Sequence, residues 1–270
     1  MKFKVACIQL CSSDNVDENL SKILNFSKQA IEDNAEFITT PENSSLFSLD
    51  KQELLSKAES FENNNFIKAI CDFVKKNKIW FLIGGMPVKD KNNKLFNRSI
   101  LIDQSGEIVN YYDKIHMFDV KLPNGETYEE SKKFQAGNSL KIYNLPWGKI
   151  GLTICYDLRF PLMYRKLTKD GAIFISVPSA FTKNTGERHW HTLLKARAIE
   201  NMCYIFAPAQ TGIHPNQRET YGHSLIISPD GEVLAEKKDG EGILLADIDT
   251  ELVTRLRAQI PSLDQDKYFL

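Results

Sequence analysis

The sequence predicts an α/β protein in which two β-sheets form a sandwich with helices on the outside, arranged with internal pseudo-twofold symmetry. Two segments of the first half are similar to two segments of the second: residues 35–41 to 172–178, and residues 99–109 to 224–234. In both halves strands alternate with helices, which is typical of layered α/β folds. Residues 79–83 form a nearly continuous apolar run, as expected of a strand that is covered on both faces.

The separate elements support this interpretation in chain order. Residues 16–34, 66–76 and 190–201 carry apolar side chains at helical spacing and predict amphipathic helices. The two similar hairpins turn at Gly106 and Gly231, and glycine provides the backbone freedom that such turns require. Residues 243–245 predict another buried strand.

Length and composition limit the class of protein. The chain has 270 residues and no linker-like stretch, so we expect one domain over residues 1–270. The net charge is −1 and the basic residues are dispersed, which argues against a nucleic-acid partner. No apolar run approaches the ~18 residues of a membrane span, and the first residues predict a strand rather than a signal peptide.

The five cysteines are an odd number and include no CxxC pair, so neither a disulfide framework nor a zinc ribbon is expected. A reducing cytoplasm fits this pattern. We expect no metal and no cofactor.

Cys155 lies where a short apolar strand, residues 151–154, is followed by a helix that starts at Pro161. A helix N-terminus favours an anion, so this position would lower the pKa of a thiol and could hold an oxyanion. The alternative is a buried structural cysteine. We expect no catalytic role for Cys7, Cys11, Cys71 and Cys203.

Two further strand ends carry complementary groups. Glu42 follows the apolar residues 37–38, and Lys114 ends the strand that contains Tyr111 and Tyr112. A carboxylate can take a thiol proton, and an ammonium can stabilise the charge on a tetrahedral intermediate, so the three residues form a set for acyl transfer. Taken alone, Glu42 could be a helix-capping acid and Lys114 a solvated lysine.

These segments resemble the nitrilase, or carbon–nitrogen hydrolase, superfamily, and the resemblance covers nearly the whole chain. It implies a four-layer α-β-β-α sandwich that assembles through its sheets and helices. The Nit branch of the superfamily is the most similar. The motifs that carry the resemblance are Pro41-Glu42, Tyr112-x-Lys114-x-His116, Cys155-Tyr156-Asp157-x-Arg159-Phe160-Pro161, residues 178–200 and Tyr221-Gly222-His223-Ser224.

The resemblance implies that Cys155 is the nucleophile, Glu42 the general base and Lys114 the oxyanion clamp, helped by the backbone N–H of Tyr156. It also assigns Glu130 as a partner of the lysine, although a solvent-exposed acid is the alternative for that residue. No metal is part of this set.

Arg159 is the candidate for binding a substrate carboxylate, because a guanidinium matches a carboxylate with two parallel hydrogen bonds. Related enzymes use an arginine there, but a structural salt bridge to Asp157 or to a partner subunit is equally open. Phe181, Thr185 and His189 are candidate pocket residues on the next strand–helix loop.

The chain departs from the Nit pattern in two places. Leu162 follows Pro161 and His191 follows Trp190, where the branch usually has glutamate. Both positions are expected near the pocket entrance or its supporting residues, so the substrate is less well defined than the chemistry.

The predicted function is a cysteine amidase that hydrolyses a linear amide of a small carboxylate-bearing substrate. Within the branch, Gln210-x-Gly212-x-His214 and Arg218 resemble the deaminated glutathione amidases. The alternative is an ω-amidase acting on α-ketoglutaramate-type monoamides; a nitrilase or a non-catalytic scaffold is less favoured. The apolar residues 260–263 and the end Tyr268-Phe269-Leu270 predict a homodimer or a higher even homo-oligomer.

Overall fold

The computed structural model describes residues 1–122 and 125–267, which contain two six-stranded sheets. The strands of the first sheet are, in spatial order, β16 (Gly242–Asp249), β1 (Lys2–Gln9), β2 (Phe37–Thr39), β3 (Trp80–Lys89), β4 (Leu95–Ile102) and β5 (Ile108–Asp113). Those of the second are β15 (Val233–Lys237), β14 (Ser224–Ile227), β11 (Tyr204–Ala207), β10 (Ala172–Ser176), β9 (Gly148–Leu152) and β8 (Lys141–Leu145).

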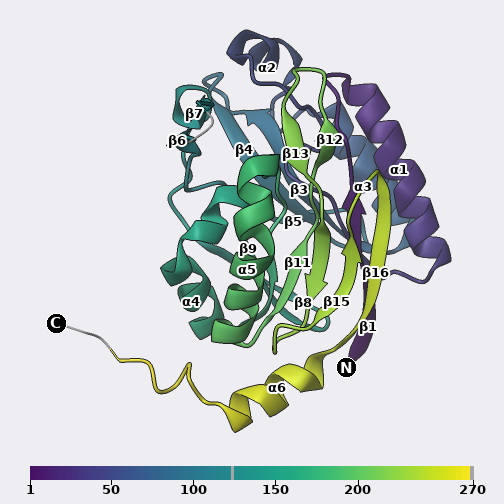
Figure 1. Cartoon of the computed structure of the whole chain (residues 1–270). Helices are drawn as coiled ribbons and strands as arrows, with labels where there is room; N and C mark the ends of the chain where they lie inside the picture. The colour runs from purple at the N-terminus through teal and green to yellow at the C-terminus, as the bar shows by residue number, and fades with distance from the viewer. Residues whose placement is uncertain (123–124, 268–270) are drawn as a thin grey trace.

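Helices cover the outer face of each sheet (Figure 1). Helices α1 (Val16–Glu32) and α3 (Asn65–Asn77) pack on the first sheet, and α4 (Pro161–Lys169) and α5 (Lys183–Asn201) pack on the second. Asn15 caps the N-terminus of α1, and its side chain accepts hydrogen bonds from the first-turn N–H groups. Two further helices, α2 (Lys51–Lys57) and α6 (Thr250–Gln259), lie outside this pattern.

The alternation of side chains along β1 explains the layers. Ala6 and Ile8 belong to the apolar core beneath α1 and α3, whereas Val5 and Cys7 point into the core between the sheets. In that core Phe37 of the first sheet meets Phe206 of the second, with ring centroids 6.0 Å apart. The predicted four-layer α-β-β-α sandwich is therefore confirmed.

The two sheets have the same strand order, which confirms the pseudo-twofold symmetry. In the first sheet β1, β2 and β3 are parallel and β4 and β5 continue antiparallel; β9, β10, β11, β14 and β15 repeat this arrangement. The similar sequence segments are β2 with β10, and the β4–β5 hairpin with the β14–β15 hairpin.

The halves differ in their additions. Two small hairpins, β6 (Asp119–Lys121) with β7 (Thr127–Glu129) and β12 (Thr211–Ile213) with β13 (Glu219–Tyr221), have no counterparts in the repeated strand order. Helix α5 begins at Lys183 rather than Trp190, because Thr182 caps it with its hydroxyl oxygen. No helix in the described part of the chain has the length and apolarity needed to cross a membrane. Residues 268–270, part of the predicted dimer contact, lie outside the described residues.

Candidate active site

The structure brings Glu42, Lys114 and Cys155 together in one pocket. Glu42 follows β2 and Lys114 follows β5 in the first sheet, while Cys155 follows β9 in the second. All three are buried, with 3%, 1% and 7% of their surfaces exposed. The pocket encloses about 620 Å³, including the part open to solvent. Side chains predicted from three separate strand ends thus lie at the junction of the two sheets.

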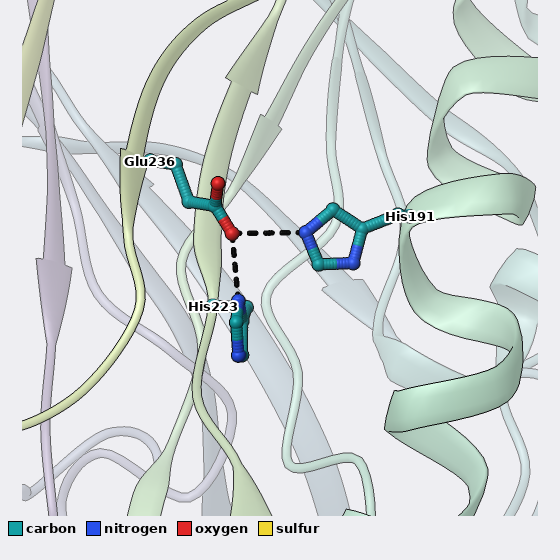
Figure 2. Close-up of side chains that lie close together, drawn as sticks. All are labelled: His191, His223 and Glu236. Atoms are coloured by element: carbon teal, nitrogen blue, oxygen red, sulfur yellow. Dashed lines mark hydrogen bonds and ion pairs between the residues drawn. The ribbon is translucent and has the colours of Figure 1, made fainter.

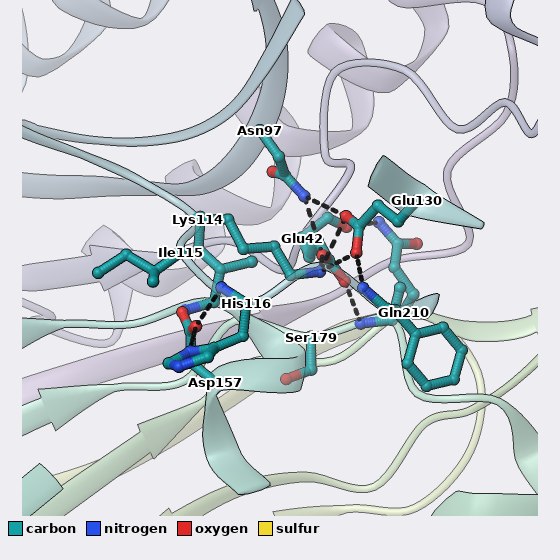
Figure 3. A network of polar contacts seen from close by, with 12 residues as sticks. Glu42, Asn97, Lys114, Ile115, His116, Glu130, Asp157, Ser179 and Gln210 are labelled. Atoms are coloured by element: carbon teal, nitrogen blue, oxygen red, sulfur yellow. Dashed lines mark hydrogen bonds and ion pairs between the residues drawn. The ribbon is translucent and has the colours of Figure 1, made fainter. Parts of the chain in front are cut away.

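Lys114 is held between two carboxylates (Figure 3). Its Nζ lies 2.8 Å from Glu42 Oε1 and 2.9 Å from both oxygens of Glu130. Burial disfavours the ammonium, but the two carboxylates outweigh it and hold the pKa of Lys114 well above its ordinary value. Glu130 is therefore a partner of the lysine and not a solvated acid, whereas its neighbour Glu129 pairs with Lys132.

Glu42 is fixed by groups that the sequence analysis did not assign. Its Oε1 also accepts a hydrogen bond from Asn97 Nδ2 at 2.9 Å, and its Oε2 accepts one from the backbone N–H of Ala180 at 3.0 Å. Gln210 Nε2 donates to the backbone carbonyl of Glu42 at 2.9 Å. Burial acts to raise the pKa of Glu42, but the charge and the hydrogen bond of Lys114 lower that pKa by a larger amount. The net shift is downward, so the carboxylate is ionised.

Cys155 begins a five-residue 3₁₀ turn, Cys155–Arg159, at a backbone φ of +50°. Its N–H donates to the Pro178 carbonyl at 2.9 Å, and the negative charge of the Glu42 carboxylate acts on its thiol. A left-handed conformation is strained in a non-glycine residue and recurs where a turn must present a nucleophile. The tertiary contacts therefore maintain a sharp turn that directs the sulfur at Glu42.

The predicted lowering of the Cys155 pKa is wrong for the free protein. Burial raises the pKa of the thiol, the charge of Glu42 raises it further, and Lys114 compensates only in part. The helix begins at Pro161, as predicted, but the 3₁₀ turn separates it from Cys155, so the thiol does not lie at the N-terminus of α4. The resting site consequently holds a neutral thiol beside an ionised carboxylate.

Asp157 fastens the Cys155 turn to the first sheet. Its carboxylate accepts hydrogen bonds from the backbone N–H of Ile154 at 2.8 Å and from the Tyr112 hydroxyl at 2.8 Å, and it lies 2.7 Å from His116 Nδ1. These contacts occupy Asp157, so it is not the partner of Arg159 that one alternative proposed. The Tyr-x-Lys-x-His segment therefore supports the nucleophile as well as providing Lys114.

Three of the four candidate substrate residues line the pocket. Arg159, Phe181 and Thr185 line the pocket together with Tyr156, but His189 is not among the lining residues. Instead His189 Nδ1 lies 3.3 Å from Arg159 Nη2, and partial burial together with that guanidinium lowers the pKa of His189. Thr185 and His189 stand on helix α5, not on a loop as predicted, because the helix starts early.

Two more cations line the pocket, Lys133 and Arg218. Arg218 lies on the β12–β13 hairpin, in the segment whose sequence resembles the deaminated glutathione amidases. Its Nη2 donates to the Ala180 carbonyl, and its buried Nε has no hydrogen-bond partner among the described residues. Lys133 Nζ donates to the Leu49 carbonyl at 3.2 Å and has no carboxylate partner within the described segments. Three cations, Arg159, Lys133 and Arg218, therefore line the pocket in addition to Lys114 and the carboxylates.

The two positions where glutamate was expected do not line the pocket. Leu162 is 82% exposed on α4, and His191 contacts Glu236 on β15. Cys11 lies 4.0 Å from His214 Nδ1, but that nitrogen already meets the Ser12 carbonyl at 2.8 Å, and neither Cys11 nor His214 lines the pocket.

The fold is shared with solved structures of known class. The crystal structure of the Caenorhabditis elegans NitFhit protein matches 98% of this chain with a TM-score of 0.93 and 34% sequence identity. The match covers 65% of that longer chain, a nitrilase and fragile histidine triad fusion protein, so this chain spans about two thirds of it.

The family model "Carbon-nitrogen hydrolase" matches residues 4–258. A deaminated glutathione amidase of Dictyostelium discoideum is 40% identical over 267 residues, covering 96% of this chain and 92% of the relative. One of Yersinia enterocolitica is 37% identical, covering 98% and 93%. The chain belongs to the carbon–nitrogen hydrolase family, and the prediction of an amide-hydrolysing enzyme of the nitrilase superfamily is confirmed.

Replacement of Lys114 by methionine tests the buried ion cluster. Without the ammonium, Glu42 and Glu130 face one another as buried like charges, so we expect the free energy of unfolding to fall by about 3–5 kcal/mol near neutral pH. Like charges raise carboxyl pKa values, and the folded variant then gains protons as pH falls. The loss should therefore shrink between about pH 7.5 and about pH 5, in urea unfolding at both values.

Lys133→Met is the matched control, because that lysine meets a carbonyl rather than a carboxylate. It should cost less and show no such recovery at low pH. An equal loss for Lys114→Met at both pH values would contradict the charge balance described here.

Proposed function

We propose that the protein is a cysteine amidase that cleaves linear amides through an acyl-thioester on Cys155. The observation that carries the proposal is the meeting of the Cys155 thiol, the Glu42 carboxylate and the Lys114 ammonium at the base of one pocket. An ionised base beside a neutral thiol is the starting state that general-base catalysis of thiol attack requires.

The reaction follows from these positions. Glu42 takes the proton from Cys155 as the sulfur attacks the amide carbon, and the carbonyl oxygen becomes an oxyanion. Lys114 and the backbone N–H of Tyr156 stabilise that charge, and the loss of one such donor typically costs roughly 2.7–4 kcal/mol in the transition state. Glu42 then gives its proton to the leaving nitrogen, so the C–N bond breaks and an acyl-thioester remains. Water attacks the thioester with Glu42 again as base, which releases the acid and restores the thiol.

The substrate that we propose is an amide with a carboxylate, of the deaminated glutathione type. The cations Arg159, Lys133 and Arg218 around the pocket support it, since a desolvated guanidinium is stabilised when an anion meets it. The names of the two amidase relatives support the same class. An ω-amidase that acts on α-ketoglutaramate-type monoamides is the second candidate, because the same cations suit a keto acid.

A panel of amides, nitriles and N-carbamoyl compounds distinguishes these activities when ammonia and amine release are both measured. Acceptance of a bulky amide substituent separates the two amidase candidates. Turnover of nitriles alone would indicate a nitrilase, and no turnover of any compound would indicate a scaffold.

We expect Cys155→Ala to abolish turnover while the fold is retained, because the proposed acyl-thioester cannot form without the thiol. Glu42→Gln keeps the shape of the side chain but removes the proton carrier, so turnover should fall severely. Rapid-quench mass spectrometry should reveal a small fraction of acyl-thioester in Glu42→Gln and none in Cys155→Ala. Amidase activity in Cys155→Ala above a small residual fraction would refute the assignment of the nucleophile.

We expect Arg159→Ala to lower kcat/KM for an acidic amide but not for its neutral analogue. The loss should correspond to about 1.5–3 kcal/mol, the range for a hydrogen bond to a charged group. Arg159→Lys should recover only part of it, because an ammonium lacks the planar fork. Arg188→Ala on the exposed face of α5 is the matched control and should leave both substrates unchanged.

An equal loss for both substrates would assign Arg159 a structural role, through His189 and the aromatic rings of Phe181 and Tyr156. The same pair of substrates applied to Arg218→Ala then asks whether the hairpin cation recognises the carboxylate instead.

We also propose a homodimer or a higher even homo-oligomer in the cytoplasm. Leu162 on α4 and Ile199 on α5 are 82% and 51% exposed on the helix layer that covers the second sheet. Light scattering at micromolar concentration should give at least twice the mass of one chain, and Leu162→Glu should shift it toward the monomer. Ile213→Glu, at an exposed residue of the β12–β13 hairpin, is the control. A monomeric parent protein would contradict the proposal.

A further inference from the structure

Three side chains capable of binding a metal ion meet outside the pocket, on the flank of the second sheet. His191 comes from the middle of helix α5, His223 directly precedes β14, and Glu236 lies on β15. Figure 2 shows both imidazole rings directed at the same carboxylate. Their separation in the chain hides the group from any spacing pattern, which is why the sequence predicted no metal.

The ligand atoms are close enough for one ion. Glu236 Oε1 lies 2.9 Å from His191 Nε2 and 2.6 Å from His223 Nδ1, and one atom of each residue lies within 4.8 Å of the others. Ligand atoms around a tetrahedral zinc ion are roughly 3.3 Å apart, since zinc–nitrogen and zinc–oxygen bonds are about 2.0–2.2 Å. Small side-chain rotations would therefore open the group to the size of a zinc site.

The site is partly built before any ion arrives. The ring of His223 stacks on Tyr221, with centroids 4.2 Å apart, and its backbone carbonyl accepts a hydrogen bond from Trp190 Nε1 at 2.7 Å. Partial burial acts to raise the pKa of Glu236, but the hydrogen bonds to His223 and His191 lower it, so the carboxylate is ionised. The carboxylate is thus in the form that a divalent cation binds, and an ion would displace the protons that the two ring nitrogens direct at it.

We propose that His191 Nε2, His223 Nδ1 and Glu236 form a binding site for a divalent transition-metal ion, with zinc as the best fit. Two imidazoles and one carboxylate are a ligand set that zinc favours, and imidazole is also suited to nickel and copper. Each ring must carry its proton on its other nitrogen to offer a lone pair to the ion.

The ion would tie helix α5 to the edge of the second sheet. The three side chains are 33%, 21% and 23% exposed, so an ion can enter from solvent and retain water as a fourth ligand. The same helix presents Thr185 to the pocket at its first turns. His191 stands where the Nit pattern has glutamate, so the site arises from a residue in which this chain departs from its relatives' pattern.

Zinc titration by calorimetry tests the proposal, in the full-length protein with Cys155→Ala to remove the active-site thiol. We expect one zinc ion per chain and a melting temperature that rises with zinc, because the ion binds the folded state. His191→Gln and His223→Asn should each lower the affinity by at least about 10-fold. His189→Gln, on the same helix but facing Arg159, should bind zinc as the parent does.

Cobalt substitution gives an independent readout. We expect visible absorption of cobalt bound by nitrogen and oxygen, which His191→Gln and Glu236→Gln abolish. No zinc binding by the parent would show that the group is only a hydrogen-bonded ion pair and would overturn the proposal. Equal binding by His191→Gln and the parent, or a thiolate-to-cobalt charge-transfer band that identifies Cys11 or Cys71 as the ligand, would also overturn it.

Discussion

The site depends on the balance of charge around one buried lysine. Lys114 is 1% exposed and lies between Glu42 and Glu130, so each carboxylate is tolerated in the interior only because the ammonium is present. When Glu42 takes the proton of Cys155, the negative charge moves from one neighbour of Lys114 to another. The total charge of the buried cluster does not change, so the proton transfer requires little reorganisation of the surroundings.

The pseudo-twofold symmetry explains why this cluster can be assembled at all. Parallel strands at the centre of each sheet end at one edge, where the connections to the following segments leave the sheet. Glu42 and Lys114 come from connections of the first sheet and Cys155 from a connection of the second, so packing of the two sheets completes the set. In the equivalent position to Glu42 after β10, the second half has Ser179, which donates to the Val177 carbonyl and has no carboxylate chemistry. The duplicated framework therefore carries a single site.

Local sequence indicated much of the fold and offered Glu42, Lys114 and Cys155 as candidates, and the resemblance to the nitrilase superfamily supplied their expected roles. Apolar periodicity and the repeated segments indicated the layers, and the strand ends indicated where Glu42, Lys114 and Cys155 would lie. The pKa of Cys155 could not be predicted, because it depends on burial by segments distant in the chain. Asn97, Gln210 and Arg218 could not be assigned roles for the same reason, since their contacts form only when both sheets and the β12–β13 hairpin are in place.

The pairing of β1 with β16 has a consequence for the order of folding. In the second sheet, β9 pairs with β8, the strand immediately before it in the chain. In the first sheet, the equivalent partner of β1 is β16, in which Asp249 pairs with Lys2, so this pair joins distant segments of the chain. During synthesis, therefore, β1 emerges long before β16, the strand that pairs with its outer edge. Such an unpaired edge can associate with other nascent chains, so the newly made protein depends on protection of β1 until β16 leaves the ribosome.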